Sequence, residues 1–202
     1  MTKRLFDIIS SFLGLIVLLP LLIIIGLIIK IDSKGPVFYR GVRVGKNEKL
    51  FKIFKFRTMV PNAEKLGGPS TAENDPRATR VGKLLRKYKF DELPQLINVL
   101  KGEMSIVGPR PQVEKYVALY SQDEKIILTI KPGMTDYASI KLINLDEILG
   151  NKDVDKRYKE VIEPEKNKLR VEYAKHNSIF IDFKIIIKTF LALLKIVFSG
   201  KK

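Results

Sequence analysis

The sequence predicts a mainly helical α+β protein with an N-terminal membrane anchor and a small β-hairpin. A run of 22 residues without a charge lies between Asp7 and Lys30. Two short segments rich in aromatic and β-branched residues follow, on either side of a turn. Beyond residue 80, apolar residues recur at helical spacing. We assign residues 1–34 to the anchor and 35–202 to one further domain, since 202 residues suffice for a single core.

The charge-free run is long enough to cross a bilayer. A straight helix over these residues would span about 30 Å at 1.5 Å per residue. No small-residue cleavage site follows the run, which disfavours a cleaved signal peptide. Pro20 lies near its middle and removes one helical hydrogen bond, so we expect a kink or a break in the helix there.

Basic residues flank the anchor on both sides. Lys3 and Arg4 precede it, and a longer set follows: Lys30, Lys34, Arg40, Arg43, Lys46 and Lys49. Because basic residues prefer the cytoplasmic side, a spanning helix would place one basic flank on the wrong side. A segment that enters the membrane, bends at Pro20 and returns keeps both flanks inside. A spanning helix with a tolerated proline fits the residues alone about as well.

The hairpin is predicted from residues 37–40 and 50–56, around a turn at 45–48. Phe51 and Ile53 share one face of the second strand, whereas Phe54 and Phe56 share the other, and a β-bulge would account for the change. Residues 61–80 have the composition of a loop. Turn-forming residues also mark 102–111. Helices are predicted over 81–89, 92–100, 113–120 and 156–175.

The C-terminal segment 180–198 is amphipathic. Its aromatic and aliphatic residues follow helical spacing: Phe180, Phe183, Ile187, Phe190, Leu194 and Phe198. Lysines line another face of the same helix: Lys184, Lys188 and Lys195. A helix packed on the core has this pattern, and so does a helix that lies in the membrane interface.

Composition narrows the chemistry. The net charge of +15 indicates an anionic partner, either a membrane surface, phosphorylated substrates or nucleic acid. The apolar anchor favours the membrane and leaves nucleic acid as the runner-up. There is no cysteine and His176 is the single histidine, which excludes disulfides, thiol nucleophiles and Cys/His zinc sites. Carboxylates and cations must therefore carry any catalysis.

Asp91 and Glu92 are the first candidates for such chemistry. A helix that begins at Asp91 would place both carboxylates at its positive end, where backbone N–H groups also suit a phosphate. Basic residues surround the pair in sequence: Arg77, Arg80, Lys83, Arg86, Lys87 and Lys89. Among these cations a carboxylate should keep a low pKa and act as a nucleophile or metal ligand. A plain helix cap beside a solvated basic face explains the same residues without catalysis.

Arg110 lies between Pro109 and Pro111, which restrict the backbone on both sides. A guanidinium fixed in this way can bind two phosphate oxygens at once. A rigid turn with an exposed arginine is the simpler alternative. Lys55 and Arg57 form a further basic cluster.

Three segments together resemble the bacterial sugar transferase family, the small monotopic phosphoglycosyl transferases that begin glycoconjugate assembly. They are residues 56–59 (FRTM), 91–102 (DELPQLINVLKG) and 107–111 (VGPRP). The resemblance extends from residues 3–7 to residues 176–178 and 182–184, nearly the whole chain.

The resemblance implies a re-entrant helix bent at Pro20, a monotopic protein on the cytoplasmic face of the bacterial inner membrane, and dependence on Mg²⁺. Asp91 would attack the β-phosphate of a UDP-sugar and release UMP, and the phospho-sugar would then pass to polyprenol (undecaprenyl) phosphate. Glu92 would assist in proton transfer or, with Asp91, bind the Mg²⁺. We assign phosphate binding to Lys55, Arg57, Arg86 and Arg110. A nucleic-acid partner is not expected, and a homodimer is left open.

The chain departs from the family in two places. Leu19 precedes Pro20, where the family often has serine. Residues 132–143 read PGMTDYASIKLI, where the family commonly has PGITGWAQVNGR, so Asp136 stands in place of a glycine. This departure affects the choice of sugar or nucleotide more than the reaction class. The competing hypothesis is a membrane-anchored basic binding or scaffold module without catalysis. A third option is a degenerate member of the family that serves only as an assembly partner.

Overall fold

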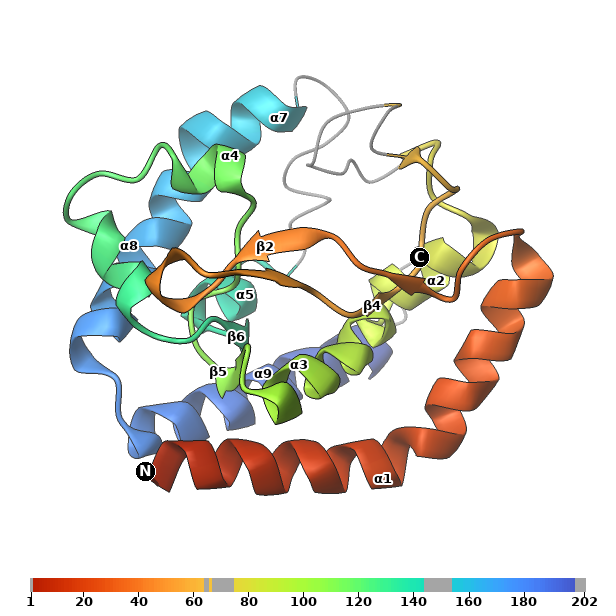
Figure 1. Ribbon diagram of the computed structural model, residues 1–202, viewed down its shortest axis with the longest axis horizontal. Coiled ribbons are helices and arrows are strands. Elements are labelled where there is room, and N and C mark those ends of the chain that lie inside the picture. Colours follow the sequence, from red (N-terminus) through yellow and green to blue (C-terminus); the bar gives the residue numbers. More distant parts are fainter. Residues whose placement is uncertain (1, 64–65, 67–74, 144–153, 199–202) are drawn as a thin grey trace.

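The computed structural model describes residues 2–63, 66, 75–143 and 154–198. They form the mainly helical α+β fold that the sequence predicts, with three small two-stranded sheets among the described residues. Figure 1 shows the first and last helices along one edge of the molecule, with the other elements on one side of them. Half of the predicted loop at 61–80 lies outside the described residues.

The first helix, α1 (Thr2–Asp32), contains Pro20 and is long and apolar enough to cross a membrane. Figure 1 shows that it changes direction sharply part way along. Proline removes one backbone hydrogen bond and crowds the preceding turn, which is a common cause of such a kink. The expected disruption at Pro20 is therefore a bend within one continuous helix, and α1 is not divided into two helices.

The hairpin consists of two strand pairs. β1 (Phe38–Tyr39) pairs with β4 (Lys55–Phe56), and β2 (Val42–Val44) pairs with β3 (Leu50–Lys52). Phe38 pairs with Phe56 and Val42 pairs with Lys52, so four steps along one strand match four steps back along the other. No residue is inserted, and the predicted bulge is wrong.

The real cause of the change of face is that both faces of the hairpin are covered. Phe51 and Ile53 pack against Val99 and Met104. On the opposite face, Phe56 packs against apolar residues of α1 and of the next helix: Ile25, Ile29 and Leu85. Hydrophobic residues are therefore required on both faces of this strand pair.

The remaining elements follow in chain order. Predicted helix 81–89 is α2 (Arg80–Lys87), and predicted helix 92–100 is a 3-10 turn, η3 (Phe90–Gln95), followed by α3 (Leu96–Lys101). The predicted helix 113–120 is shorter, α4 (Glu114–Val117), and a 3-10 turn, η4 (Glu124–Thr129), follows it. The predicted helix 156–175 consists of α7 (Val154–Arg157), a π-turn at Tyr158–Ile162 and α8 (Glu163–His176). The last described element is α9 (Ile179–Phe198), close to the predicted bounds.

The structure also contains a parallel strand pair that the sequence did not predict. β5 (Ser105–Val107) pairs with β6 (Gly133–Thr135), which leads into α5 (Tyr137–Lys141). Gly108 and Gly133 allow the two chain segments to cross closely, because a Cβ on Gly133 would overlap the backbone of Gly108. The amide of Gly133 donates to the carbonyl of Pro109 at 2.9 Å. This crossing fixes the turn that carries Arg110.

Both ends of α1 are attached to the rest of the protein. At its start, Lys3 forms an ion pair with Asp182 of α9, and the Tyr173 hydroxyl donates to the same carboxylate at 2.5 Å. One turn later, the Asp7 carboxylate accepts a hydrogen bond from the Ser105 hydroxyl at 2.9 Å. The N-terminal half of α1 is thus held against β5, α8 and α9.

At the other end of α1, Arg57 donates to the carbonyls of Ser33 and Lys34 at 2.8 and 2.6 Å. These carbonyls follow the last helical turn and lack intrahelical partners. Asp32 accepts from the backbone amide of Val81 at 3.3 Å, near the start of α2. Both ends of the helix are therefore attached to the same body of the protein.

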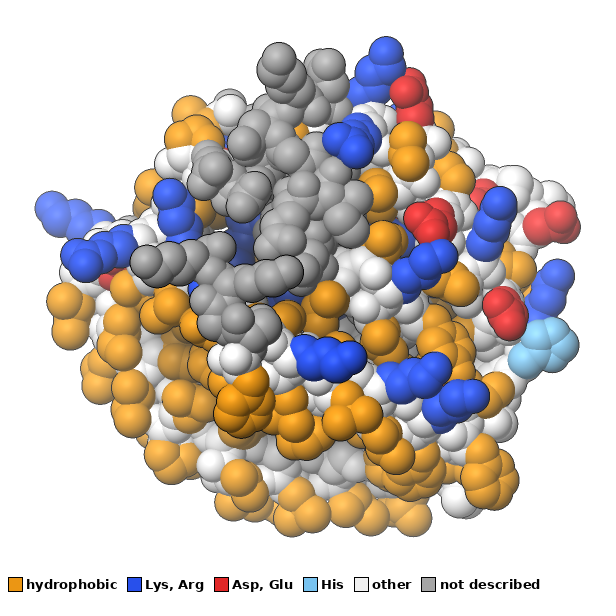
Figure 2. Space-filling model, turned by 180° about the vertical axis from the view of Figure 1, so that it is seen from behind, with side chains coloured by type: hydrophobic (Ala, Val, Ile, Leu, Met, Phe, Trp, Pro, Cys, Tyr) orange, Lys and Arg blue, Asp and Glu red, His pale blue; other side chains and the backbone are white. Residues whose placement is uncertain are grey.

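The aromatic face of α9 is not part of the core. Phe180, Ile187 and Phe190 are 82%, 59% and 61% exposed, whereas Asp182 and Ile185 are the buried residues of the helix. Figure 2 shows hydrophobic side chains gathered along the lower face of the molecule, with Lys and Arg side chains above them. The helix therefore packs on the core through Ile185, and the aromatic face that its spacing marks is a different, exposed one.

Replacing Gly133 by alanine should destabilise the fold, because the added methyl group must displace the backbone of Gly108. We expect a loss of about 2 kcal/mol, or roughly 5 °C in Tm, measured by thermal unfolding in detergent. Gly26→Ala is the matched control, since its Cβ would meet Val37 at an ordinary 3.4 Å. An unchanged Tm for Gly133→Ala would contradict the close crossing.

Candidate active site

Asp91 and Glu92 lie in the 3-10 turn η3, immediately before α3. Lys89 adopts a left-handed conformation (φ 59°, ψ 19°) and separates this turn from α2. The prediction that an α-helix begins at Asp91 is wrong, since α3 begins at Leu96 and no side chain caps η3. The left-handed residue redirects the chain into a tight turn, which brings both carboxylates to the junction between α2 and α3.

Asp91 is buried, and its Oδ1 atom has no hydrogen-bond partner among the described residues. Burial raises the pKa of Asp91 to about 6, and the neighbouring charge of Glu92 adds to the rise, while Lys55, Lys89 and Arg110 oppose it. The predicted low pKa for this carboxyl is therefore wrong, because desolvation outweighs the surrounding cations. Above pH 6 the group is an ionised carboxylate with little solvation.

Glu92 has the opposite environment. Its Oε1 atom accepts a hydrogen bond from Lys55 Nζ at 3.0 Å and another from the Arg110 guanidinium. Burial by itself would raise the pKa of Glu92, but Arg110 and then Lys55 hold that pKa well below its ordinary value. Glu92 therefore stays ionised and fixes two cations beside Asp91.

Arg110 is fixed at three points. Its backbone amide donates to Asp136 Oδ2 at 3.0 Å, and its side chain donates to the Met134 carbonyl at 3.0 Å as well as to Glu92. Asp136 in turn forms an ion pair with Arg170 of α8 at 3.3 Å. The restriction predicted from the flanking prolines is thus reinforced by contacts from β6 and α8.

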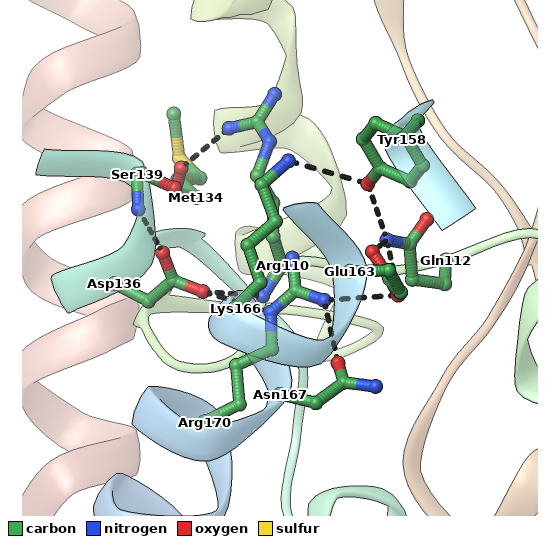
Figure 3. A network of polar contacts seen from close by, with 10 residues as sticks. All are labelled: Arg110, Gln112, Met134, Asp136, Ser139, Tyr158, Glu163, Lys166, Asn167 and Arg170. Carbon is green, nitrogen blue, oxygen red and sulfur yellow. Dashed lines mark hydrogen bonds and ion pairs between the residues drawn. The ribbon is translucent and has the colours of Figure 1, made fainter. Parts of the chain in front are cut away.

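Figure 3 shows the polar network around Arg110. Gln112 donates to the Tyr158 hydroxyl and to Glu163, each at 2.8 Å, and Arg170 contacts Glu163 at 3.4 Å. The sequence did not predict this network, whose members are Gln112, Tyr158, Glu163 and Arg170, or that Asp136 would hold the Arg110 backbone. The one signal for the network was the aspartate at 136, which stands where the resembled family has glycine.

The other two predicted phosphate-binding residues have different neighbours. The Arg57 guanidinium is buried against the end of α1, as described above. Arg86 lies on α2 and helps to lower the pKa of Asp75, whose main partner is Arg77. The structure therefore brings together Asp91, Glu92, Lys55 and Arg110, and it gives Arg57 a structural role.

The residues present fit the predicted Mg²⁺ only in part. Within the described ranges there is no group of three or more acidic or histidine side chains suited to a metal ion. Asp91 Oδ1 is available, whereas Glu92 Oε1 already contacts two cations. Mg²⁺ commonly uses one or two carboxylates and takes its other ligands from water and substrate phosphates. Asp91, with the second oxygen of Glu92, is compatible with that mode.

Lys55→Met should raise the pKa of Asp91 above about 6, because the substitution removes a positive charge that favours the ionised carboxyl. The measurement is a pH titration of the Asp91 carboxyl ¹³C resonance in the solubilised protein. Lys52→Met, on the exposed side of the same hairpin, is the control and should leave the titration unchanged. A shift to lower pH in the Lys55 variant would contradict the charge arrangement.

The chain is similar to several known proteins over most of its length. The chain matches the family described as bacterial sugar transferase over residues 1–196. Undecaprenyl-phosphate glucose phosphotransferase of Komagataeibacter xylinus is 39% identical, over 98% of this chain and 36% of that protein. Exopolysaccharide production protein ExoY of Rhizobium meliloti (strain 1021) is 36% identical, over 94% of this chain and 84% of that protein. Undecaprenyl-phosphate galactose phosphotransferase of Salmonella typhimurium is 41% identical, over 76% of this chain and 33% of that protein.

The chain thus spans about a third of the length of two of these relatives and most of the length of ExoY. The match to the family covers all of the described residues except 197 and 198, including the anchor, the hairpin and both carboxylates of the site. This chain therefore belongs to the bacterial sugar transferase family.

Proposed function

We propose that this protein transfers a sugar 1-phosphate from a UDP-sugar to undecaprenyl phosphate, with Asp91 as the nucleophile and UMP as the leaving group. The observation that carries the proposal is the buried Asp91 carboxylate, whose Oδ1 has no partner in the described part of the chain although cations lie close by. A buried carboxylate oxygen without a hydrogen bond is costly, so it is expected at a site where a ligand completes it. Two of the relatives are named as phosphotransferases that act on undecaprenyl phosphate.

The reaction proceeds in two displacements at one site. An ionised Asp91 oxygen attacks the β-phosphorus of the UDP-sugar, and the bond from that phosphorus to the bridging oxygen breaks as UMP leaves. A phosphate oxygen of the polyprenol phosphate then attacks the same phosphorus, and the bond to Asp91 breaks. The products are UMP and a polyprenyl diphosphosugar. Covalent catalysis separates the meeting of two bulky anions into two steps.

The neighbours of Asp91 have distinct roles. Lys55 and Arg110 supply positive charge where the diphosphate must approach, and Glu92 fixes both of them by hydrogen bonds. Mg²⁺, when bound, would offset negative charge on the diphosphate, with Asp91 and Glu92 as its protein ligands. Because burial keeps Asp91 poorly solvated, its ionised form is a stronger nucleophile than a solvated carboxylate.

Asp91→Asn should abolish transfer, since an amide cannot form the acyl phosphate. Wild-type protein given radiolabelled UDP-sugar without acceptor should retain label after denaturation, and the label should map to Asp91. Asp123→Asn is the control, because Asp123 is exposed in the turn before η4. Normal turnover by Asp91→Asn, or an adduct on another side chain, would exclude this mechanism.

We also propose that the protein is monotopic, with a re-entrant α1 and with α9 in the interface on the cytoplasmic side of the inner membrane. The support is that both ends of α1 contact the same body, at Lys3–Asp182 and at Arg57–Ser33. A spanning helix would place its two ends on opposite sides of a bilayer about 30 Å thick. The exposed aromatic face of α9 and the lysines beside it suit a helix in the headgroup region.

The chain has no cysteine, so single cysteines report topology without background. Cysteines placed at Thr2 and at Lys34 should both resist a membrane-impermeant reagent in intact cells and both react in inverted vesicles. Lys168→Cys, on the exposed side of α8, gives the cytoplasmic reference. Labelling of one end alone in intact cells would show that α1 spans the membrane.

A further inference from the structure

Lys166 of α8 is a buried cation without an anionic partner among the described residues. It is 7% exposed, and its Nζ atom donates to the Tyr158 hydroxyl at 3.2 Å, above the ring of the same tyrosine at 4.5 Å. Both of these partners are uncharged at neutral pH. A buried ammonium group normally has a carboxylate beside it, because desolvation of an unpaired charge is costly.

The nearby carboxylates are occupied by another cation. Arg170 contacts Asp136 at 3.3 Å and Glu163 at 3.4 Å, and Gln112 donates to both oxygens of Glu163 at 2.8 Å. Arg170 itself is 2% exposed, so these pairs are sheltered from solvent. Both carboxylates are therefore in direct contact with Arg170, and among the described residues neither forms an ion pair with Lys166, although together they carry one negative charge more than Arg170 offsets.

Lys166 is also close to like charges. Burial first, and then repulsion by Arg170 and Arg110, lowers the pKa of Lys166 to about 7, although Glu163 and Asp136 oppose the shift. Figure 3 shows the head groups of Lys166 and Arg110 on the same side of the network, away from Arg170. On that side Arg110 reaches Glu92, next to Asp91. Lys166 and Arg110 thus lie together on the side of the network from which Arg110 reaches the site.

We propose that Lys166 binds a phosphate oxygen of a substrate, beside Arg110, and so extends the site from η3 to α8. The inference rests on the proposed function for the kind of substrate, because UDP-sugar and polyprenol phosphate both carry phosphate. A lysine ammonium binds phosphate as a compact charge and needs no fixed fork geometry. A substrate phosphate would give Lys166 the direct anionic contact that no described carboxylate makes, and this would explain why an amine lies at this buried position.

The test is direct binding to the solubilised full-length protein, with UMP as one probe and a short-chain polyprenol phosphate as the other. Lys166→Met keeps the length of the side chain and removes the charge. We expect its Kd for one of the two probes to rise about tenfold or more, as for loss of a charged hydrogen bond. A change for UMP assigns Lys166 to the donor phosphate, and a change for the lipid assigns it to the acceptor phosphate. Calorimetry needs no turnover, so a failure of Asp91 chemistry does not affect this result.

Stability distinguishes binding from support of the fold. Removal of an unpaired buried charge should leave the Tm of Lys166→Met unchanged or raise it, whereas a structural lysine would lower the Tm when replaced. Lys166→Arg should retain most of the phosphate affinity because it keeps the charge. Lys168→Met, two residues along α8 and exposed, is the matched control. Unchanged affinity for both probes in Lys166→Met, or an equal loss in Lys168→Met, would overturn the proposal.

Discussion

The fixed position of Arg110 is the constraint on which the site depends. Its backbone is held by Asp136 and its side chain by Met134 and Glu92, so one residue joins β6, η3 and, through Asp136, α8. Hydrogen bonds between charged groups in such a network are strong when every group has its partners. Removal of one partner is costly, because it leaves a buried charge unpaired. The arrangement holds positive charge beside Asp91 before any substrate arrives. Preorganised charge of this kind is a major source of catalysis in phosphoryl transfer.

Two adjacent carboxylates are given different properties by their surroundings. Glu92 accepts hydrogen bonds from Lys55 and Arg110, so its pKa is lowered although it is partly buried. Asp91 receives no comparable hydrogen bond, and desolvation together with Glu92 raises its pKa. The contrast separates a supporting carboxylate from the one proposed as the nucleophile, within two residues of sequence. This difference arises because Glu92, and not Asp91, faces Arg110. The turn after Lys89 determines which of the two carboxylates does so.

Periodic features of the sequence predicted their elements well, and contacts between distant segments were not predicted. The bounds of α2 and α9 follow from helical spacing, and the hairpin follows from its turn and its aromatic residues. The start of α3 was missed because a left-handed Lys89 has no sequence signature comparable to glycine. The pairing of β5 with β6 joins segments of three residues each, too short for a pattern. Of the site, the carboxylates, Lys55 and Arg110 were predicted, whereas the ion pair between Asp136 and Arg170 joins positions that only the fold brings together.

The anchor and the site are parts of one packed unit. Arg4 of α1 donates to the carbonyls of Val99 and Leu100 at 2.6 and 2.9 Å, near the C-terminal end of α3. The opposite end of α3 adjoins η3, which carries Asp91. A short helix bound in this way transmits the position of α1 to the carboxylates, because its hydrogen-bonded backbone deforms little. If α1 lies in the membrane as proposed, its depth sets the height of Asp91 above the lipid. A phosphate carried on a lipid is confined to that height, so the proposed second displacement would require a rigid connection between α1 and η3.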